Sequence, residues 1–286
     1  MRKILAQIYK ALAKAFSGYG IGSFYPIKVI RNFILPYLTS GPLDILEHKM
    51  FIDAKDSLSL STHGIYEPLE TEIARKEIKE GNVVIDVGAN IGYYTLIFAK
   101  LVGEEGKVFA FEPAPENFAL LKKNVEINGY KNVVLIQKAV SNKTGRIRLY
   151  LSEVEGTTHK IYDSHDGRKS IEIEAISLDD YFEDYNGEIN FIKIDAEGSE
   201  ASVFQGMQNL LEKNKGVKIT TEFFPSALKE SGIEPGEYLD LLLKYGFKLY
   251  DINERRKRVE PLNTPELIKA LSLKKVTTSL LCLREA

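Results

Sequence analysis

The chain has 286 residues, 44% of them hydrophobic, which is enough for one large α/β domain and an accessory segment. The net charge of −2 and the sequence pI of about 6.2 argue against a general polyanion-binding surface, although a local basic patch remains compatible with them. No run of 18 apolar residues is present, so no membrane-spanning helix is expected.

Cysteine and histidine usage points to an intracellular protein without a metal. The single cysteine, Cys282, lies in an apolar stretch and is predicted to be a core residue without a disulfide, as in a reducing cytoplasm. The four histidines have no spacing typical of metal ligands. A divalent ion held by carboxylates remains an alternative.

Residues 1–60 are predicted to form an accessory helical segment, and residues 61–286 the main domain. Apolar residues at helical spacing, interrupted by charges, predict an amphipathic helix within residues 1–16. This helix would pack on its own domain or on a second copy in a homodimer, or lie on a membrane surface. Residues 50–53 and 58–61 predict a short hairpin that leads into the domain.

Residues 82–95 predict a cofactor site. A β-branched run at 83–87 is typical of a strand buried on both faces, and it contains Asp86 near its end. The loop that follows carries Gly88, Asn90 and Gly92 and opens into a helix over 92–102. Glycines let the backbone approach a ligand, and the free N–H groups of the helix start face it.

The loop pattern favours S-adenosylmethionine over NAD. The dinucleotide fingerprint is G-x-G-x-x-G, whereas this loop is G-x-N-x-G. The charge of Asp86 would repel a pyrophosphate but suits the amino group and the sulfonium of S-adenosylmethionine. The second strand, 107–112, ends in Glu112, which is placed to accept hydrogen bonds from both ribose hydroxyls. An NAD enzyme is therefore disfavoured.

Three segments, 86–95, 111–113 and 193–200, resemble the motifs of the FkbM-type S-adenosylmethionine-dependent methyltransferases in sequence, order and spacing. The resemblance extends from about residue 64 to about residue 283. It implies a Rossmann-like class I methyltransferase fold, an α/β fold with a mostly parallel seven-stranded sheet and an antiparallel edge strand. It also implies S-adenosyl-L-methionine as the cofactor.

The chain alternates strands and helices as a parallel sheet requires. Helix 70–79 precedes strand 83–88, helix 92–102, strand 107–112, helix 115–128 and strand 133–140. Strands 145–151 and 170–176 alternate polar and apolar residues and are expected to pair antiparallel. The polar loop between them, 152–169, is typical of a lid or a binding loop. Its His159 is a candidate base, with a solvated loop histidine as the alternative.

Later strands bring more acids to the same edge of the sheet. Strand 191–195 ends at Asp195 and opens into a helix through residue 211, and strand 217–224 carries Glu222. Sites in parallel sheets lie at the carboxyl ends of strands, so these acids are expected to share one rim with Asp86 and Glu112. Strands 247–252 and 279–283 are predicted to pair antiparallel at one edge.

The resemblance extends the set of cofactor contacts. It places Tyr66 and Glu67 near the methionine end of the cofactor and the backbone of Ala139 beside the adenine. The predicted cofactor-binding residues are Tyr66, Glu67, Asp86, Gly88, Asn90, Gly92, Tyr93, Glu112, Pro113, Ala139 and Asp195.

An acceptor hydroxyl needs a base, because an alkoxide is too basic to form freely at neutral pH. By resemblance, Lys193, Asp195, Glu197 and Glu200 occupy the acceptor side of the cofactor. Asp195 is the first choice of base, with Glu197 and Glu222 as further catalytic residues. Alternatively, Lys193 points away to pair with an acid inside the sheet layer, and Glu200 only complements a helix dipole.

The resemblance implies O-methylation of a hydroxyl on a sugar, a glycan or a secondary metabolite. An RNA methyltransferase is a second possibility, kept open by the basic cluster 255–258, which is otherwise a solvated turn. A third is an assembly protein that binds the cofactor without catalysis. The acids predicted at the rim argue against this third alternative, because a module that only binds the cofactor needs no acid positioned as a base.

Overall fold

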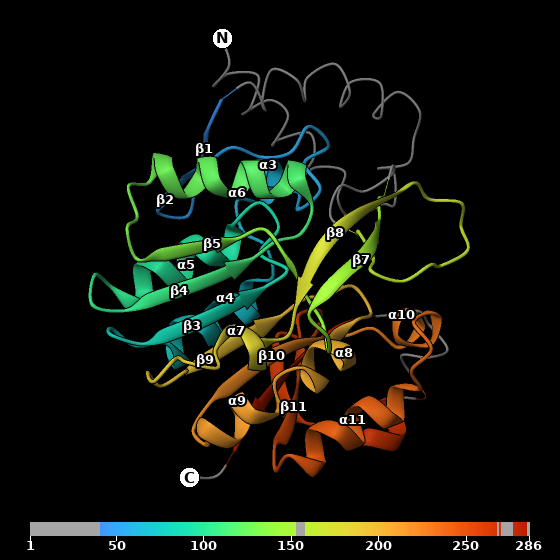
Figure 1. The fold of residues 1–286 in the computed structure, drawn as a ribbon. Helices are drawn as coiled ribbons and strands as arrows, with labels where there is room; N and C mark the ends of the chain where they lie inside the picture. The colour runs from blue at the N-terminus through green and yellow to red at the C-terminus, as the bar shows by residue number, and fades with distance from the viewer. Residues whose placement is uncertain (1–40, 153–157, 268, 270–276, 285–286) are drawn as a thin grey trace.

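The structure, a computed structural model, describes residues 41–152, 158–267, 269 and 277–284 (Figure 1). Within them the main sheet has eight strands in the spatial order β12 (Arg258–Pro261), β11 (Lys248–Asn253), β13 (Thr278–Leu283), β10 (Lys218–Phe223), β9 (Phe191–Ile194), β3 (Val83–Val87), β4 (Lys107–Phe111) and β5 (Val133–Ile136). The five strands from β10 to β5 are mutually parallel, which confirms the predicted α/β class.

The C-terminal part of the sheet differs from the prediction in two respects. The strands predicted at 247–252 and 279–283 do pair antiparallel, as β11 and β13, but β13 lies between β10 and β11 instead of at an edge. The edge strand is β12, which pairs antiparallel with β11 and makes eight strands where seven were predicted. The basic cluster 255–258 lies at the turn and start of this added strand.

Helices precede, connect and follow the parallel strands. In chain order they are α4 (Pro68–Glu77), α5 (Tyr93–Val102), α6 (Pro115–Ile127), α7 (Leu178–Tyr181), α8 (Glu200–Gln205), α9 (Gln208–Lys213), α10 (Pro225–Glu230) and α11 (Pro235–Lys244). The single helix predicted up to residue 211 is thus two short helices. They separate at Gly206, where an added Cβ would lie 2.2 Å from the carbonyl oxygen of Ser141.

A second sheet of three strands stands beside the first, in the order β6 (Ala139–Val140), β8 (Ser170–Ile176) and β7 (Gly145–Tyr150). The predicted antiparallel pairing of the last two is confirmed. The strand predicted over 133–140 is wrong in extent, because β5 ends at Ile136 and Ala139–Val140 pairs with β8. The chain therefore leaves the main sheet just before Ala139.

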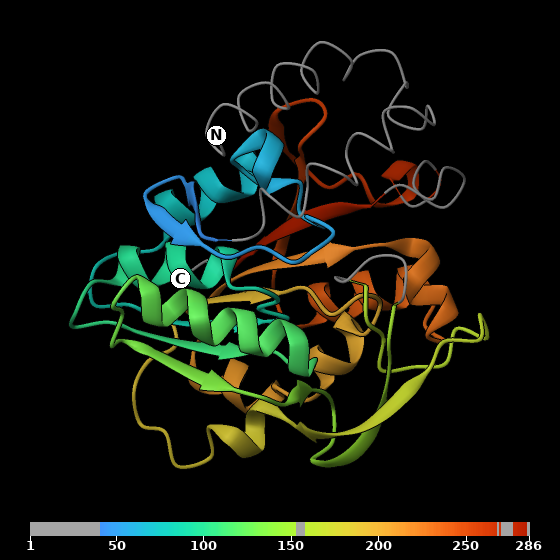
Figure 2. The same cartoon turned by 90° about the horizontal axis from the view of Figure 1, so that it is seen from above.

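The N-terminal described segment forms a hairpin of β1 (Leu43–Ile45) and β2 (His48–Met50), followed by α3 (Leu60–His63). The predicted hairpin at 50–53 and 58–61 is therefore wrong. Figures 1 and 2 show β1 and β2 beside α6, and the Asn124 side chain accepts a hydrogen bond from the Phe51 backbone N–H at 2.7 Å. The predicted helix at 1–16 lies outside the described residues, and the boundary at residue 60 stays a prediction.

The main sheet is covered on both faces, because neighbouring side chains on a strand point to opposite sides. On β3, Val84 belongs to a core with residues of α4, α5 and α6, including Ala74, Leu96 and Leu121. Ile85 belongs to a core with residues of α7, α8, α9 and α11, including Leu178, Val203, Leu210 and Leu239. Across the described part of the chain, no helix is long and apolar enough to cross a bilayer.

The ends of β3 and β9 approach each other very closely. Gly88 follows β3 with a φ of 76°, and a Cβ built on it would lie 1.8 Å from the carbonyl oxygen of Asp195. The Asp195 N–H donates to the carbonyl oxygen of Val87 at 3.0 Å. Only glycine fits this approach, which brings the loop after β3 against the loop after β9.

Gly88→Ala is expected to destabilise the protein far more than Gly129→Ala. Gly129 also has a positive φ, of 74°, but nothing lies within 4 Å of its built Cβ. Its substitution should cost about 1–2 kcal/mol of backbone strain, whereas Gly88→Ala adds a clash and should cost about 3 kcal/mol or more. Urea unfolding of both variants measures the difference, and equal costs would contradict the close approach.

Candidate active site

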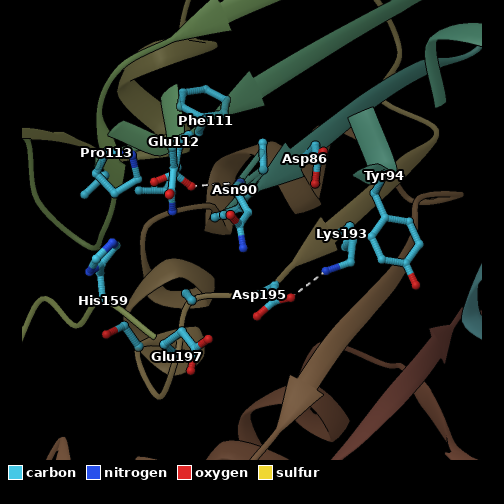
Figure 3. A pocket seen from close by; sticks show the side chains of 18 of the residues that line it. Asp86, Asn90, Tyr94, Phe111, Glu112, Pro113, His159, Lys193, Asp195 and Glu197 are labelled. Atoms are coloured by element: carbon cyan, nitrogen blue, oxygen red, sulfur yellow. Dashed lines mark hydrogen bonds and ion pairs between the residues drawn. The ribbon is translucent and has the colours of Figure 1, made fainter. Parts of the chain in front are cut away.

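A pocket lies at the carboxyl ends of β3, β4, β9 and β10 and includes residues of β6, β7 and the loop before β8 (Figure 3). Among the predicted site residues, those that line it are Tyr66, Asp86, Gly88, Asn90, Tyr93, Glu112, Pro113, Ala139, Asp195, Glu197 and Glu222. Glu67 and Gly92 were predicted to bind the cofactor but are not lining residues. The predicted rim of acids at strand ends is thus present as one pocket.

Glu112 is held by the backbone on both sides. Its Oε2 accepts the Asn90 N–H and its Oε1 accepts the Ala114 N–H, each at 2.8 Å. Burial raises the pKa of Glu112 to about 7, while these two hydrogen bonds act in the opposite direction. Each carboxylate oxygen has a second lone pair, so the residue can still accept hydrogen bonds from two hydroxyls of a ligand.

Asp86 and Asn90 form the floor of the pocket beside β3. Asp86 is 1% exposed and accepts a hydrogen bond from the Thr95 hydroxyl at 2.5 Å. Burial raises its pKa to about 6, opposed by the charge of Lys193. Asn90 has a φ of 51°, and its buried Oδ1 has no hydrogen-bond partner among the described residues. Such an acceptor is costly without a ligand donor.

Lys193 lines the pocket, so the alternative that it points away from the rim is wrong. Its Nζ is 2.9 Å from Oδ2 of Asp195 and 4.7 Å from the centre of the Tyr94 ring (Figure 3). Burial alone would lower its pKa. The surrounding carboxylates, led by Asp195 and Glu70, raise it overall, so the ammonium group stays charged at neutral pH.

Glu67 contacts Tyr94, which lines the pocket, but is not itself a lining residue. The Tyr94 hydroxyl donates to Oε2 of Glu67 at 3.1 Å, and the Tyr93 hydroxyl accepts the Tyr66 N–H at 3.2 Å. Burial raises the pKa of Glu67 to about 8. Glu67 therefore supports the aromatic wall in this structure. Gly92 packs beneath the loop, with a built Cβ 2.8 Å from Leu121.

Acids of the loop after β9 occupy different positions. Glu200 is fully buried, and its Oε1 accepts the N–H groups of Ala196 and Gly198 at 3.0 Å each. It therefore shapes the loop and does not line the pocket. Burial raises its pKa to about 7. Glu197, which is half-buried and has a φ of 51°, does line the pocket, as does Glu222 on β10.

His159 also lines the pocket, and its Nδ1 is occupied as a hydrogen-bond acceptor. Its Nδ1 accepts the Ser152 N–H at 3.0 Å, and burial lowers its pKa. A neutral ring with Nδ1 occupied in this way carries its proton on Nε2. This geometry therefore argues against His159 as the base and also against a fully solvated loop histidine.

Sequence reasoning did not single out several lining residues. Some lie within the motif segments, namely Tyr94, Phe111, Ala196 and Ser199, and the tertiary structure adds others from outside them: Ser57, Leu58, Asn117, Lys138, Val140, Leu149 and Ile161. The alternation in 145–151 was a signal for Leu149, whereas no pattern marked 57–58. Within the described residues, no group of three or more histidine, cysteine or acidic side chains could hold a metal ion. The basic residues 255–258 are exposed and do not line the pocket.

These residues fit the cofactor that the loop pattern predicted. Glu112 has free acceptor capacity for two hydroxyls, and the unpartnered Asn90 oxygen needs a donor. Asp86 supplies negative charge for an amino group and a sulfonium, and Asp195 lines the same pocket. A pyrophosphate would meet these same carboxylates and be repelled.

The known proteins that this chain resembles are methyltransferases. The family model described as the methyltransferase FkbM domain matches residues 86–249. The chain is 32% identical over 171 residues to the hexuronic acid methyltransferase AglP of Haloferax volcanii, a match that covers 58% of this chain and 64% of that protein. It is 38% identical over 60 residues to a protein-L-isoaspartate O-methyltransferase of Methanococcoides burtonii, covering 21% and 30%. The matches thus span less than two thirds of either relative.

Solved structures with a similar chain path include a SAM-dependent methyltransferase from Aquifex aeolicus, with 17% identity, a TM-score of 0.45 and coverage of 82% of this chain and 100% of that one. A SAM-dependent O-methyltransferase from Thermotoga maritima has 17% identity, a TM-score of 0.39 and coverage of 78% and 66%.

Glu200→Gln is expected to reduce the pH dependence of stability. Because the folded-state pKa of Glu200 is raised, the stability it confers is fully present below its unfolded pKa and is lost as the pH rises toward about 7. The amide keeps the Oε1 acceptor without titrating. The difference in unfolding free energy between about pH 5 and about pH 8 should shrink by about 2 kcal/mol.

Urea unfolding at both pH values measures this effect. Glu172→Gln is the matched control, since Glu172 is an exposed glutamate paired with Arg146, and its substitution should leave the difference unchanged. An unchanged difference in Glu200→Gln would show that the buried glutamate is ionised in the folded state.

Proposed function

The chain belongs to the FkbM family of methyltransferases, whose methyl donor is S-adenosylmethionine, and we propose that it methylates a hydroxyl group of a sugar. The observation that carries this proposal is the position of Asp195 in the same pocket as Asp86 and Glu112, with its carboxylate held by Lys193 at 2.9 Å. A candidate base thus shares one pocket with the residues suited to the cofactor.

Two observations favour a sugar as the methyl acceptor, namely the similarity to one named relative and the chemistry of the pocket. The relative with 32% identity is a hexuronic acid methyltransferase, which supports a sugar as the acceptor. A hexuronic acid presents a carboxylate as well as several hydroxyl groups, and we place the methyl group on a hydroxyl because a candidate base lies in the pocket. The pocket offers carboxylates for such hydroxyls on one side and apolar residues, including Leu149 and Ile161, on another. The exposed basic turn at 255–258 lies outside this pocket, so no observation favours RNA as the acceptor.

When bound, S-adenosylmethionine supplies an electrophilic methyl group on a positively charged sulfur atom. In this proposal Glu112 holds the ribose hydroxyls, and Asp86 with the neighbouring carboxylates attracts the positive charge. The backbone around Gly88 and Asn90 approaches the cofactor, and Ala139 with Pro113 borders its base.

Asp195 takes the proton of the acceptor hydroxyl as it is methylated. Lys193 fixes this carboxylate through the ion pair at 2.9 Å, so its free oxygen has a defined position. Glu197 lines the same side of the pocket and is the second candidate for this step. Tyr94 and the buried acids behind Lys193 keep the lysine in place.

Asp86→Ala and Glu112→Ala are each expected to weaken binding of S-adenosylhomocysteine by about tenfold or more, because each removes a charged hydrogen-bonding group from the cofactor site. Calorimetric titration with S-adenosylhomocysteine, and with NAD for comparison, measures this. Glu172→Ala is the control and should bind as the wild type does. A wild type that binds NAD in preference would refute the proposed cofactor site.

Asp195→Asn is expected to retain S-adenosylhomocysteine binding within about threefold and to lose about 100-fold or more in turnover, since the amide keeps the shape but cannot accept the proton. Transfer of a labelled methyl group to hexuronic acids and their methyl glycosides gives the rate. Loss of binding without a specific loss of turnover would make Asp195 a cofactor ligand and not the base. Full turnover in the variant would exclude it from both roles.

A further inference from the structure

Glu222 differs from the other acids of the pocket in having one buried oxygen without a partner. Its Oε1 accepts a hydrogen bond from the Thr277 hydroxyl at 3.1 Å. Its Oε2 is buried and has no hydrogen-bond partner among the described residues, although the residue lines the pocket. An ionised carboxylate with a buried, unpartnered oxygen is costly, and a neutral acid is much less so.

The charges around Glu222 also favour its neutral form. Asp195 and Glu197 face it from the loop after β9, and Glu200 faces it from α8. Tyr66, which precedes α4, also lies close enough for the charge of Glu222 to affect its pKa. The ammonium group of Lys193 is paired with Asp195 and not with Glu222. Burial first, and then these carboxylates, raise the pKa of Glu222 well above its usual value.

From this arrangement we propose that Glu222 acts as a neutral carboxylic acid that donates a hydrogen bond from Oε2 to an oxygen atom of the acceptor sugar. This proposal rests on the proposed function. Thr277 donates to Oε1, which leaves the proton on Oε2. Glu222 is then an acceptor-binding residue, and not a base. Two acids on neighbouring strands thereby have opposite roles, with Asp195 accepting a proton and Glu222 donating a hydrogen bond.

The neutral state can be tested directly by infrared spectroscopy of the full chain with S-adenosylhomocysteine bound. The difference spectrum between the wild type and Glu222→Gln should contain the carbonyl band of a neutral carboxylic acid at neutral pH. This band should shift when glucuronic acid or methyl glucoside is added. The absence of the band, or a band that neither sugar shifts, would overturn the proposal.

Measurements of activity distinguish whether Glu222 acts as a hydrogen-bond donor or as a base. Glu222→Gln keeps an N–H donor and should retain kcat/KM within about threefold, whereas Glu222→Ala should lose about tenfold or more. Because the neutral form is the active one, wild-type kcat/KM should fall as the pH rises through the pKa of Glu222, and Glu222→Gln should lack this decrease. Equal losses in the two variants would make Glu222 a base or a structural residue.

A failure of the proposed function can be distinguished from a failure of the proposed role of Glu222. The former would appear as a wild type that binds no S-adenosylhomocysteine or transfers no methyl group, while the infrared band still reports the state of Glu222. Urea unfolding of both variants excludes a loss of folding as the cause. Glu172→Gln, which changes an exposed acid on β8, should change neither the carbonyl band nor the pH profile.

Discussion

Lys193 places one buried ammonium group among carboxylates that come from the ends of β3 and β9 and from α4. It pairs with Asp195 at 2.9 Å, and the charges of Glu70, Glu67 and Asp86 also act on it. Removing one partner from such a group leaves an uncompensated buried charge, which typically costs about 3–5 kcal/mol. The lysine therefore allows several acids to be buried together, and that concentration of acids is what makes the pocket suitable for a cationic cofactor.

The geometry of the pocket depends on two backbone features as much as on its charges. Gly88 lets the loop after β3 pass directly against the carbonyl oxygen of Asp195, which fixes the distance between the two strand ends. Glu112 is held by the N–H groups of Asn90 and Ala114, so the end of β4 is tied to the loop after β3. Three neighbouring strand ends are thus locked together before any ligand is bound, as a preorganised site requires.

Identical side chains take different roles in this pocket because their surroundings differ. Glu112 has both oxygens satisfied by backbone donors, whereas Glu200 uses one oxygen to hold the loop and does not line the pocket. Glu222 and Glu200 each have one buried oxygen without a described partner, but only Glu222 lines the pocket, where it faces other acids. Desolvation disfavours the charged form in all three, but only local donors and cations decide which acid stays ionised.

The local elements and the edge on which the site lies could be predicted from the amino-acid sequence alone. The β-branched run at 83–87, the glycine loop and the acids at strand ends predicted β3, α5 and a shared rim, because strand and helix periods and loop chemistry act over a few residues. The order of the last strands, the break at Gly206 and the choice between the two predicted positions of Lys193 came only from the tertiary structure. These features depend on contacts between segments far apart in the chain, and burial and charge at such contacts have no signature in local sequence.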